Sequence, residues 1–392
     1  MRRFGAYLGL ALAVAALAAA SAAGAQRAAR PPAAFFGVDP QERVGPDDAD
    51  WMRAGGIGAV RIPVSWAGVE PTAPSGDPAE HTYNWSGTDR SVEAAVSHGL
   101  RVLPFLYATP SWAAPSETDL PIADQRARAG WRDFLSAAVQ RYGPSGTFWA
   151  EHSPLSADPL PQVPLRRWQV WNEENFFHFT RPVSPPAYAG LLRSSAEAIR
   201  AADPGAGIVI GGLFGKPREG PPLGLPAATY LNRLYAVPGI RSSFDEVAIH
   251  PYAASVARMR RLVEDFRAVV RRHRDGARTV ITELGWGSQN DPRVVAFELG
   301  LPGQARALRR AYSFLLSNRH RLALRQVFWF AWRDVTFPAC SFCDSSGLFR
   351  AGPGFEPKPA WYRLTGFSGG VPRPARPLPV RIVFADGKRR RP

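Results

Sequence analysis

Cysteine, methionine and lysine are scarce in this 392-residue sequence, which contains two Cys and three Met. Its only lysines are Lys216, Lys358 and Lys388, so arginine carries nearly all of the positive charge. The two cysteines, Cys340 and Cys343, are too few for a disulfide scaffold or a Cys-rich metal centre. No second metal-ligand pair accompanies them, so we expect a disulfide that closes a small loop.

Several motifs that would indicate other chemistry are also absent. The first predicted strand is not followed by Gly-x-Gly-x-x-Gly, which argues against a dinucleotide-binding fold. There is no Gly-x-Ser-x-Gly of the kind that carries an esterase nucleophile. There is also no His-Glu-x-x-His and no calcium-binding loop. We therefore expect neither a cofactor nor a metal.

Long apolar runs are missing except at the N-terminus. Arg2 and Arg3 precede an apolar run from Leu8 to Ala20, and Ala23-Gly24-Ala25 has the small-x-small pattern of a cleavage site. The run is shorter than the ~20 residues that span a membrane, so it predicts a signal peptide cleaved after Ala25 and an exported protein. An uncleaved anchor remains the alternative. We expect no membrane span after signal removal.

The formal net charge is +15. The arginines are spread along the chain, apart from a basic cluster at 388–391, and this spread favours a solvated surface over a nucleic-acid-binding face. We therefore expect no nucleic-acid partner, while an anionic glycan stays open as a substrate. We also expect a monomer.

Short β-rich runs alternate with amphipathic helical stretches, which predicts βα units and a parallel sheet. Between the third and fourth runs, for example, a helical stripe extends from Trp131 to Tyr142 and stops at Gly143-Pro144. Eight such units close as a (β/α)8 TIM barrel, an α/β fold. The eight predicted strands are Phe35–Asp39, Ala59–Val64, Arg101–Tyr107, Arg167–Asn172, Gly207–Leu213, Glu246–His250, Thr279–Glu283 and Gln326–Trp332. The segments Gly143–Leu165 and Gly215–Leu225 are predicted long loops that would shape a binding site.

Two of these strands end in a glutamate. Strand four runs into Asn172-Glu173-Glu174, and strand seven ends at Glu283. In such barrels the active site lies at the carboxyl ends of the strands. Two carboxylates that meet there can cleave a glycosidic bond, one as acid and base and the other as nucleophile. Each glutamate alone could instead form an ordinary salt bridge, but the pair in this setting favours catalysis.

With these residues in place, the sequence resembles glycoside hydrolase clan A, the retaining barrel glycosidases. Asn172-Glu173 matches the clan's Asn-Glu pair, which implies Glu173 as acid/base and Asn172 as a ligand of the sugar 2-hydroxyl. Glu283 in Thr-Glu-Leu-Gly-Trp-Gly matches the nucleophile segment. His250-Pro-Tyr252 is similar to the clan's His-x-Tyr, so Tyr252 would orient the nucleophile. His250 could contact the substrate or simply hydrogen-bond the backbone at its strand end.

Arg61 matches the clan's strand-two arginine that contacts the nucleophile. The resemblance spans about Ala34 to Leu364 and looks closest to the family-39, xylosidase-like branch, with family 5 next. One departure is Glu174, where many members have Pro or Asp. This second glutamate leaves open which carboxylate faces the sugar, and we choose Glu173 because it follows Asn172 directly.

The environment of each glutamate can also be predicted. Apolar or anionic surroundings should raise the pKa of Glu173, while Arg61 and Tyr252 should keep Glu283 ionised. Tryptophans at or just past the strand ends suit a sugar-stacking surface. We expect Trp332 to form the floor under the cleaved sugar, with Trp329 second, and Trp171 to be part of the core. The other expected sugar-stacking residues are Trp66, Trp112 and Trp286.

The resulting expectation is an exported retaining glycoside hydrolase that acts on a β-linked oligo- or polysaccharide. Its layout would be a signal peptide (1–25), a linker (26–33), a catalytic barrel (34–366) and a Pro/Arg-rich extension (367–392). Two alternatives stay open: a barrel that binds carbohydrate without turnover, and a cell-surface interaction protein that uses the basic tail.

Overall fold

A computed structural model describes residues 31–76, 80–290, 296–336, 340–352 and 354–374, and its compact unit begins at Ala33. The predicted signal peptide, most of the C-terminal extension and the basic cluster lie outside the described residues. None of the described helices combines the length and the apolar character needed to cross a membrane.

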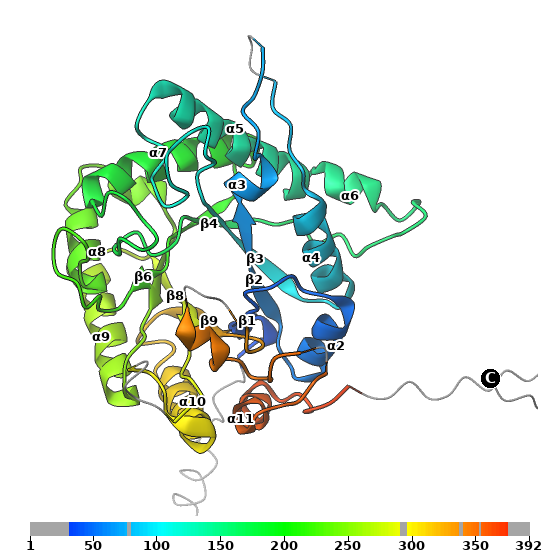
Figure 1. The fold of residues 1–392 in the computed structure, drawn as a ribbon, viewed down its shortest axis with the longest axis vertical. Helices are drawn as coiled ribbons and strands as arrows, with labels where there is room; N and C mark the ends of the chain where they lie inside the picture. The colour runs from blue at the N-terminus through cyan, green and yellow to red at the C-terminus, as the bar shows by residue number, and fades with distance from the viewer. Residues whose placement is uncertain (1–30, 77–79, 291–295, 337–339, 353, 375–392) are drawn as a thin grey trace, which may run out of the picture. The chain divides into compact units, whose positions relative to one another are not determined.

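Nine strands alternate with helices along the described chain (Figure 1). The strands are β1 (Phe36–Asp39), β2 (Ala59–Ser65), β3 (Arg101–Tyr107), β4 (Arg167–Val170), β5 (Gly207–Ile210), β6 (Leu213–Phe214), β7 (Glu246–His250), β8 (Arg278–Leu284) and β9 (Leu324–Phe330). The α-helices are α2 (Pro46–Ala54), α3 (Trp66–Val69), α4 (Ser86–Ser97), α5 (Gln125–Tyr142), α6 (Thr147–Glu151), α7 (Pro185–Ala202), α8 (Ala227–Tyr235), α9 (Val256–Arg272), α10 (Gly300–Ser317) and α11 (Pro359–Ser368). Three 3₁₀ turns complete the list: η1 (Ala33–Phe35), η2 (Ile240–Ser243) and η3 (Ser341–Asp344).

The strands form one closed parallel sheet. Their order is β5-β4-β3-β2-β1-β9-β8-β7-β6, and a further pairing between Val209 of β5 and Glu246 of β7 closes the ring. The two-residue strand β6 extends the same barrel position as β5, so eight positions make up the barrel. Helices surround it on the outside (Figure 1). This is the predicted (β/α)8 barrel, and the fold class is confirmed.

The fifth barrel position is broken where the prediction had one continuous strand. Strand β5 stops at Ile210, and β6 starts at Leu213. A Cβ atom on Gly211 would overlap the carboxylate of Glu174, and one on Gly212 would overlap the imidazole of His250. The break therefore gives two buried polar side chains the space that a regular strand residue would fill.

The helices follow the predicted apolar stripes. In α5, Asp124 caps the first turn by accepting a hydrogen bond from the Ala127 amide at 2.8 Å, and the helix ends before Gly143. The predicted apolar stripe is buried in the structure; its six residues are Trp131, Phe134, Leu135, Ala138, Val139 and Tyr142. Burial of this face stabilises the helix far more than its intrinsic propensity does.

One of the two predicted loops lies at the end of the barrel opposite the expected binding site. The segment Gly143–Leu165 contains the short helix α6 and connects α5 to β4. It therefore lies at the amino ends of the strands, opposite the carboxyl-end mouth where barrel active sites form. The other long segment, Gly215–Leu225, follows β6 and does lie on the mouth side.

Candidate active site

Arg61 organises the carboxyl end of the barrel. Its side chain comes from β2 and is 1% exposed. One terminal nitrogen, Nη1, donates to Asp39 Oδ2 at 2.5 Å and to Glu283 Oε1 at 2.7 Å. The other, Nη2, donates to Asn172 Oδ1 at 2.7 Å, and Nε donates to Gln169 at 2.9 Å. This guanidinium thus fixes four side chains that come from three strand positions, β1, β4 and β8.

Glu283 lies near the end of β8 between two fixed donors. The Tyr252 hydroxyl donates to its Oε2 at 2.8 Å, and Arg61 donates to its Oε1. The carboxylate is 8% exposed, so it is nearly enclosed. Charge-assisted bonds of this kind hold a carboxylate in one orientation.

Glu173 faces Glu283 across a buried imidazole. His250 Nδ1 lies 2.7 Å from Glu173 Oε1 and 3.4 Å from Glu283 Oε2. One oxygen of each carboxylate and a ring nitrogen of His250 all lie within 4.8 Å of one another. The structure therefore brings together the two glutamates that the sequence singles out, although they are 110 residues apart in the chain.

The two carboxyl groups have different pKa values because their neighbours differ. Desolvation, reinforced by the charge of Glu283, raises the pKa of Glu173 well above its ordinary value. Desolvation also raises the pKa of Glu283, but Arg61 opposes this and the pKa reaches only about 7. The expected high pKa of Glu173 thus agrees in direction, whereas Glu283 is less strongly held in its ionised form than we expected.

His250 is neutral in this environment, because desolvation and then the charge of Arg61 lower its pKa well below the ordinary value. Its second ring nitrogen, Nε2, lies 2.9 Å from the Thr282 hydroxyl. Both ring nitrogens are therefore occupied by protein groups, and the side chain is fully buried. The geometry makes His250 a hydrogen-bond partner of Glu173, and its contact with a substrate stays a prediction.

The turn after β4 positions Glu173. Trp171 and Glu173 both adopt positive φ angles, 72° and 47°, which non-glycine residues rarely do. Trp171 Nε1 donates to the Thr180 hydroxyl at 2.7 Å, and Asn175 Nδ2 donates to the backbone carbonyls of Phe214 and Leu225 at 2.7 and 2.6 Å. These anchors hold a backbone conformation that costs energy by itself.

Glu174 occupies a different place. It is fully buried next to Gly211, Tyr188 and Tyr230. Neither carboxylate oxygen has a hydrogen-bond partner of good geometry, and desolvation raises its pKa to about 8. Since His250 contacts Glu173 and the neighbours of Glu174 are the side chains of α7 and α8, Glu173 is the member of the pair that faces Glu283.

The tryptophans predicted to stack on the sugar pack against neighbouring side chains of the protein. Trp332 packs its ring against Phe349 and Trp361 at centroid distances of 4.5 and 5.4 Å, and its Nε1 donates to Asp48 at 2.8 Å. Trp329 and Trp286 are 0% exposed, and their rings pack against each other. Neighbouring side chains thus occupy these indoles, so they offer no open face to a sugar.

The two remaining tryptophans also pack inside the protein. Trp66 is 0% exposed, lies 5.2 Å from the ring of Trp112, and donates to Glu70 at 2.9 Å. Trp112 is partly buried and donates to the Glu70 carbonyl at 3.1 Å. The core prediction for Trp171 holds, since its ring packs 5.7 Å from that of Trp131.

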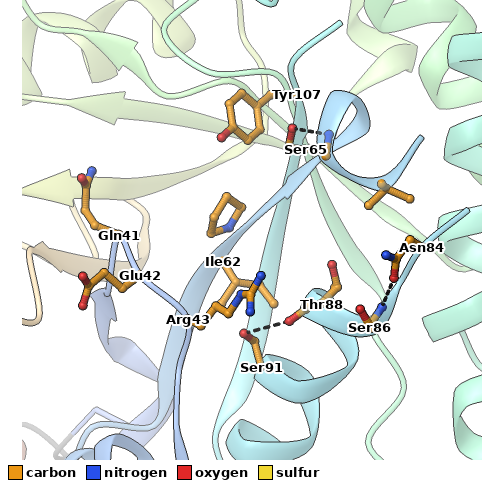
Figure 2. A pocket seen from close by; sticks show the side chains of 14 residues that line it. Gln41, Glu42, Arg43, Ile62, Ser65, Asn84, Ser86, Thr88, Ser91 and Tyr107 are labelled. Carbon is orange, nitrogen blue, oxygen red and sulfur yellow. Dashed lines mark hydrogen bonds between the residues drawn. The ribbon is translucent and has the colours of Figure 1, made fainter. Parts of the chain in front are cut away.

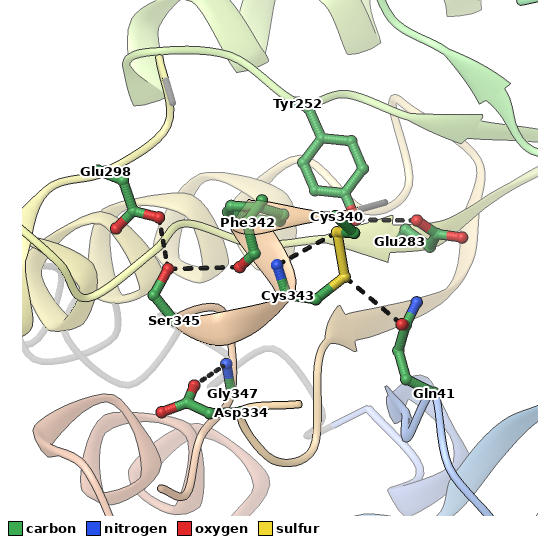
Figure 3. The surroundings of a disulfide bond; sticks show 10 residues. All are labelled: Gln41, Tyr252, Glu283, Glu298, Asp334, Cys340, Phe342, Cys343, Ser345 and Gly347. Atoms are coloured by element: carbon green, nitrogen blue, oxygen red, sulfur yellow. Dashed lines mark hydrogen bonds between the residues drawn. A yellow bond between two sulfur atoms is a disulfide. The ribbon is translucent and has the colours of Figure 1, made fainter. Parts of the chain in front are cut away.

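The cysteine prediction is confirmed, since Cys340 and Cys343 are disulfide-bonded. Figure 3 shows the bond beside Tyr252, whose hydroxyl reaches Glu283. Cys343 is buried, and its sulfur lies 3.5 Å from Gln41 Oε1. The loop that follows β9 therefore borders the candidate site.

A cavity of about 510 Å³ lies between the ends of β1, β2 and β3 and the start of α4 (Figure 2). Gln41 follows β1, Ser65 ends β2 and Tyr107 ends β3, so the cavity lies at the carboxyl ends of these strands. Polar side chains supply much of its lining; besides Gln41 they are Glu42, Arg43, Asn84, Ser86, Thr88 and Ser91.

Among the described residues, Glu173, His250 and Glu283 are the group whose donor atoms could converge on a metal ion. Their contacts suit another role. His250 Nδ1 is already at hydrogen-bond distance from Glu173, and the positive charge of Arg61 lies 2.7 Å from Glu283. A neighbouring cation opposes the binding of a second one, so the trio fits a hydrogen-bonded acid pair better than a metal centre.

Sequence reasoning missed several residues of the site. Asp39 ends β1 and pairs with Arg61, so the search for polar residues at strand ends could have found it. Gln169 and Thr282 lie within strands and contact Arg61 and His250. No signal in the sequence separates them from ordinary strand residues.

Comparison with solved structures finds the same fold in several glycoside hydrolases. The chain is similar to a family 39 glycoside hydrolase from the gut symbiont Bacteroides cellulosilyticus WH2, with 20% identity, a TM-score of 0.58, and coverage of 86% of this chain and 64% of that one. It is similar to a monomeric beta-xylosidase from Caulobacter crescentus CB15, with 18% identity, a TM-score of 0.60, and coverage of 87% and 69%.

A GH10 endoxylanase from a sugarcane soil metagenome shows 14% identity, a TM-score of 0.54, and coverage of 85% and 96%. No protein-family profile matches the sequence, and no curated protein matches it. The chain spans about two thirds of the length of the family 39 glycoside hydrolase and of the monomeric beta-xylosidase. At these identities the similarity concerns the fold, and it agrees with the resemblance to family 39.

Proposed function

We propose that this protein is a retaining glycoside hydrolase with Glu173 as acid/base and Glu283 as nucleophile. One observation carries the proposal: two buried carboxylates with unlike environments have oxygens within 4.8 Å of each other at the carboxyl ends of a closed barrel. Retaining enzymes hold their carboxyl groups about 5–5.5 Å apart, whereas inverting enzymes leave a wider gap for water.

The reaction would take place in two displacements. Glu283 attacks the anomeric carbon while Glu173 gives its proton to the leaving oxygen, and a glycosyl ester forms on Glu283. Glu173, now ionised, takes a proton from water, and the water oxygen displaces Glu283. Arg61 and Tyr252 would stabilise the carboxylate of Glu283 before attack and after release, and Asn172, held by Arg61, would contact the sugar 2-hydroxyl.

The proposed substrate is a β-linked xyloside or a related β-glycoside. The beta-xylosidase and the endoxylanase among the similar structures support this choice. We also propose that the protein is exported as a monomer, on the basis of the N-terminal signal pattern and the monomeric xylosidase. Mass spectrometry of the exported protein should find Gln26 as its first residue, and a retained Met1 would contradict cleavage.

The stereochemistry of hydrolysis tests the mechanism. The purified protein should hydrolyse chromogenic β-glycosides, and proton NMR should detect the β-anomer as the first product. Glu283→Ala should abolish this activity, while Glu264→Ala, which removes an exposed carboxylate of α9, should leave it unchanged. A first-formed α-anomer, or unchanged activity in Glu283→Ala, would refute the assignment.

A further inference from the structure

One side of the mouth carries a group of apolar side chains close to Glu173. This aromatic rim consists of Phe176, Phe177, Phe179, Phe214 and Leu223. Phe176 packs against Phe177, Phe179 and Phe214, with ring centroids 5.6, 6.3 and 5.3 Å apart. Two backbone bonds link the rim to its surroundings: Phe177 N donates to the Leu223 carbonyl, and Phe176 N donates to the Glu173 carbonyl, both at 2.9 Å.

The rim is exposed where apolar residues are usually buried. Phe179 is 44% exposed and Leu223 is 46% exposed, and they are two of only five large hydrophobic residues that are exposed among the described residues. Their proximity makes a patch rather than scattered single residues. Exposed apolar patches at the edge of a site indicate binding surfaces.

The rim is continuous with the catalytic pair. The ring of Phe214 lies 5.9 Å from that of Tyr252, whose hydroxyl donates to Glu283. The cavity at the ends of β1, β2 and β3, by contrast, carries polar side chains such as Gln41, Asn84 and Thr88 (Figure 2). The site therefore has a polar side that suits hydroxyl groups and an apolar side that does not.

The position of Glu173 decides which part of a glycoside meets the rim. An acid that protonates the leaving oxygen must lie beside the leaving group. The rim begins three residues after Glu173 in the chain, so the leaving group is the part that reaches it. The rings of the rim could stack on the C–H face of a sugar, but four phenylalanines and a leucine offer no side-chain hydrogen bonds, so sugar hydroxyls buried against them would lose their water without compensation.

From this arrangement, and on the basis of the proposed function, we propose that the aromatic rim binds the aglycone and selects glycosides with an apolar leaving group, an alkyl or aryl alcohol, over those in which the leaving group is another sugar. His178, whose ring lies 4.0 Å from that of Phe177, is the titratable side chain within this segment.

Alkyl β-xylosides of increasing chain length test this selectivity, because their leaving groups differ little in acidity. The value of kcat/KM should rise about tenfold or more from methyl to hexyl β-xyloside, since each methylene buried against the rim adds affinity. It should also exceed the value for xylobiose. Phe179→Ala and Phe177→Ala should reduce the chain-length effect severalfold, whereas Phe179→Leu should retain most of it. Tyr362 on α11 is an equally exposed aromatic residue, so Tyr362→Ala is the control and should leave the effect intact.

A binding measurement keeps this proposal separate from the proposed hydrolysis. Calorimetric titration of the Glu283→Gln variant with methyl and hexyl β-xyloside should show tighter binding of the hexyl compound, and Phe179→Ala should remove the difference. Turnover without any chain-length effect, or a preference for xylobiose, would overturn the role of the rim. Chain-length-dependent binding without turnover in the parent would support the rim and overturn the hydrolase.

Discussion

The ends of β8 and β4 present their glutamates in different ways. Strand β8 continues through Glu283 to Leu284, so that side chain belongs to the strand, at a point where the pairing with β9 shifts register between Ile281 and Leu284. Strand β4 stops at Val170, and Glu173 follows in a turn where it and Trp171 have positive φ. A carboxylate that attacks one carbon atom benefits from a fixed position, whereas an acid that serves a leaving group and then a water molecule has two positions to reach.

The partners of the two glutamates differ in the same sense. Arg61 and Tyr252 both donate to Glu283, whereas Glu173 meets a neutral imidazole. When the pair holds one proton, it therefore resides on Glu173, whose pKa is raised further. Unequal surroundings are how a barrel assigns acid and nucleophile roles to two identical residue types.

The largest expected effect is on kcat, and its dependence on the leaving group should differ between variants of Glu283 and of Glu173. Glu283→Ala should lower kcat by at least about 10³-fold for every glycoside, because no covalent intermediate forms without it. Glu173→Ala should cost about 10²–10⁴-fold for alkyl glycosides, which need protonation, but far less for dinitrophenyl glycosides, whose leaving group departs as an anion. Steady-state kinetics on both substrate classes measures this difference.

Azide provides the matched control for this comparison. It should restore turnover in both variants, giving the α-glycosyl azide with Glu283→Ala and the β-glycosyl azide with Glu173→Ala, because it replaces a different group in each. If both variants lost activity equally on both substrate classes, the two strand ends would not have distinct roles.

The sequence predicts that Glu173 and Glu283 meet because both glutamates follow apolar runs, and a charge in that position is costly unless it is paired or used. It predicts the barrel because eight strand runs alternate with helical stripes. It does not predict the break at Gly211 and Gly212, because the reason for that break is the space taken by His250 and Glu174, which are distant in the chain.

The tryptophans show where prediction from sequence stops. Trp332 and Trp329 lie near the end of the last strand, as a sugar platform would, but which side a ring faces depends on its neighbours. Phe349 and Trp361 pack on Trp332, and they come from segments after the strand, so local pattern carries no record of that contact. The aromatic surface that remains open belongs to phenylalanines after β4, whereas the prediction from sequence named only tryptophans.

The second expected effect concerns stability and distinguishes Glu174 from its neighbour. The pKa of Glu174 is about 8 in the folded protein, whereas an unfolded Glu titrates near its ordinary value. The folded state therefore binds a proton that the unfolded state releases, so the free energy of unfolding falls as pH rises through this window, by a total of about 5 kcal/mol.

Glu174→Gln removes this titration and should make the protein relatively more stable as pH rises from 5 to 8.5. Urea denaturation of parent and variant at both pH values measures the difference, in which the other buried carboxyl groups cancel. Glu264→Gln, at an exposed position of α9, should show no such change. An equal pH dependence in the parent and in Glu174→Gln would mean that Glu174 is solvated or paired in solution.

The smallest expected effect tests how the β8 end holds its charge. Tyr252 donates to Glu283 at 2.8 Å and so lowers the pKa of that carboxyl, which must be ionised to attack. In Tyr252→Phe the pKa of Glu283 should rise. The acid limb of the kcat/KM profile, which we expect near pH 7 in the parent, should then move to higher pH by about one unit. Tyr235→Phe is the matched control, since it removes a hydroxyl that donates to Asp275 at the same distance but far from the site. An acid limb that stays in place or moves to lower pH in Tyr252→Phe would show that Arg61 alone sets the charge of Glu283, and the two strand ends would then differ less than their hydrogen bonds indicate.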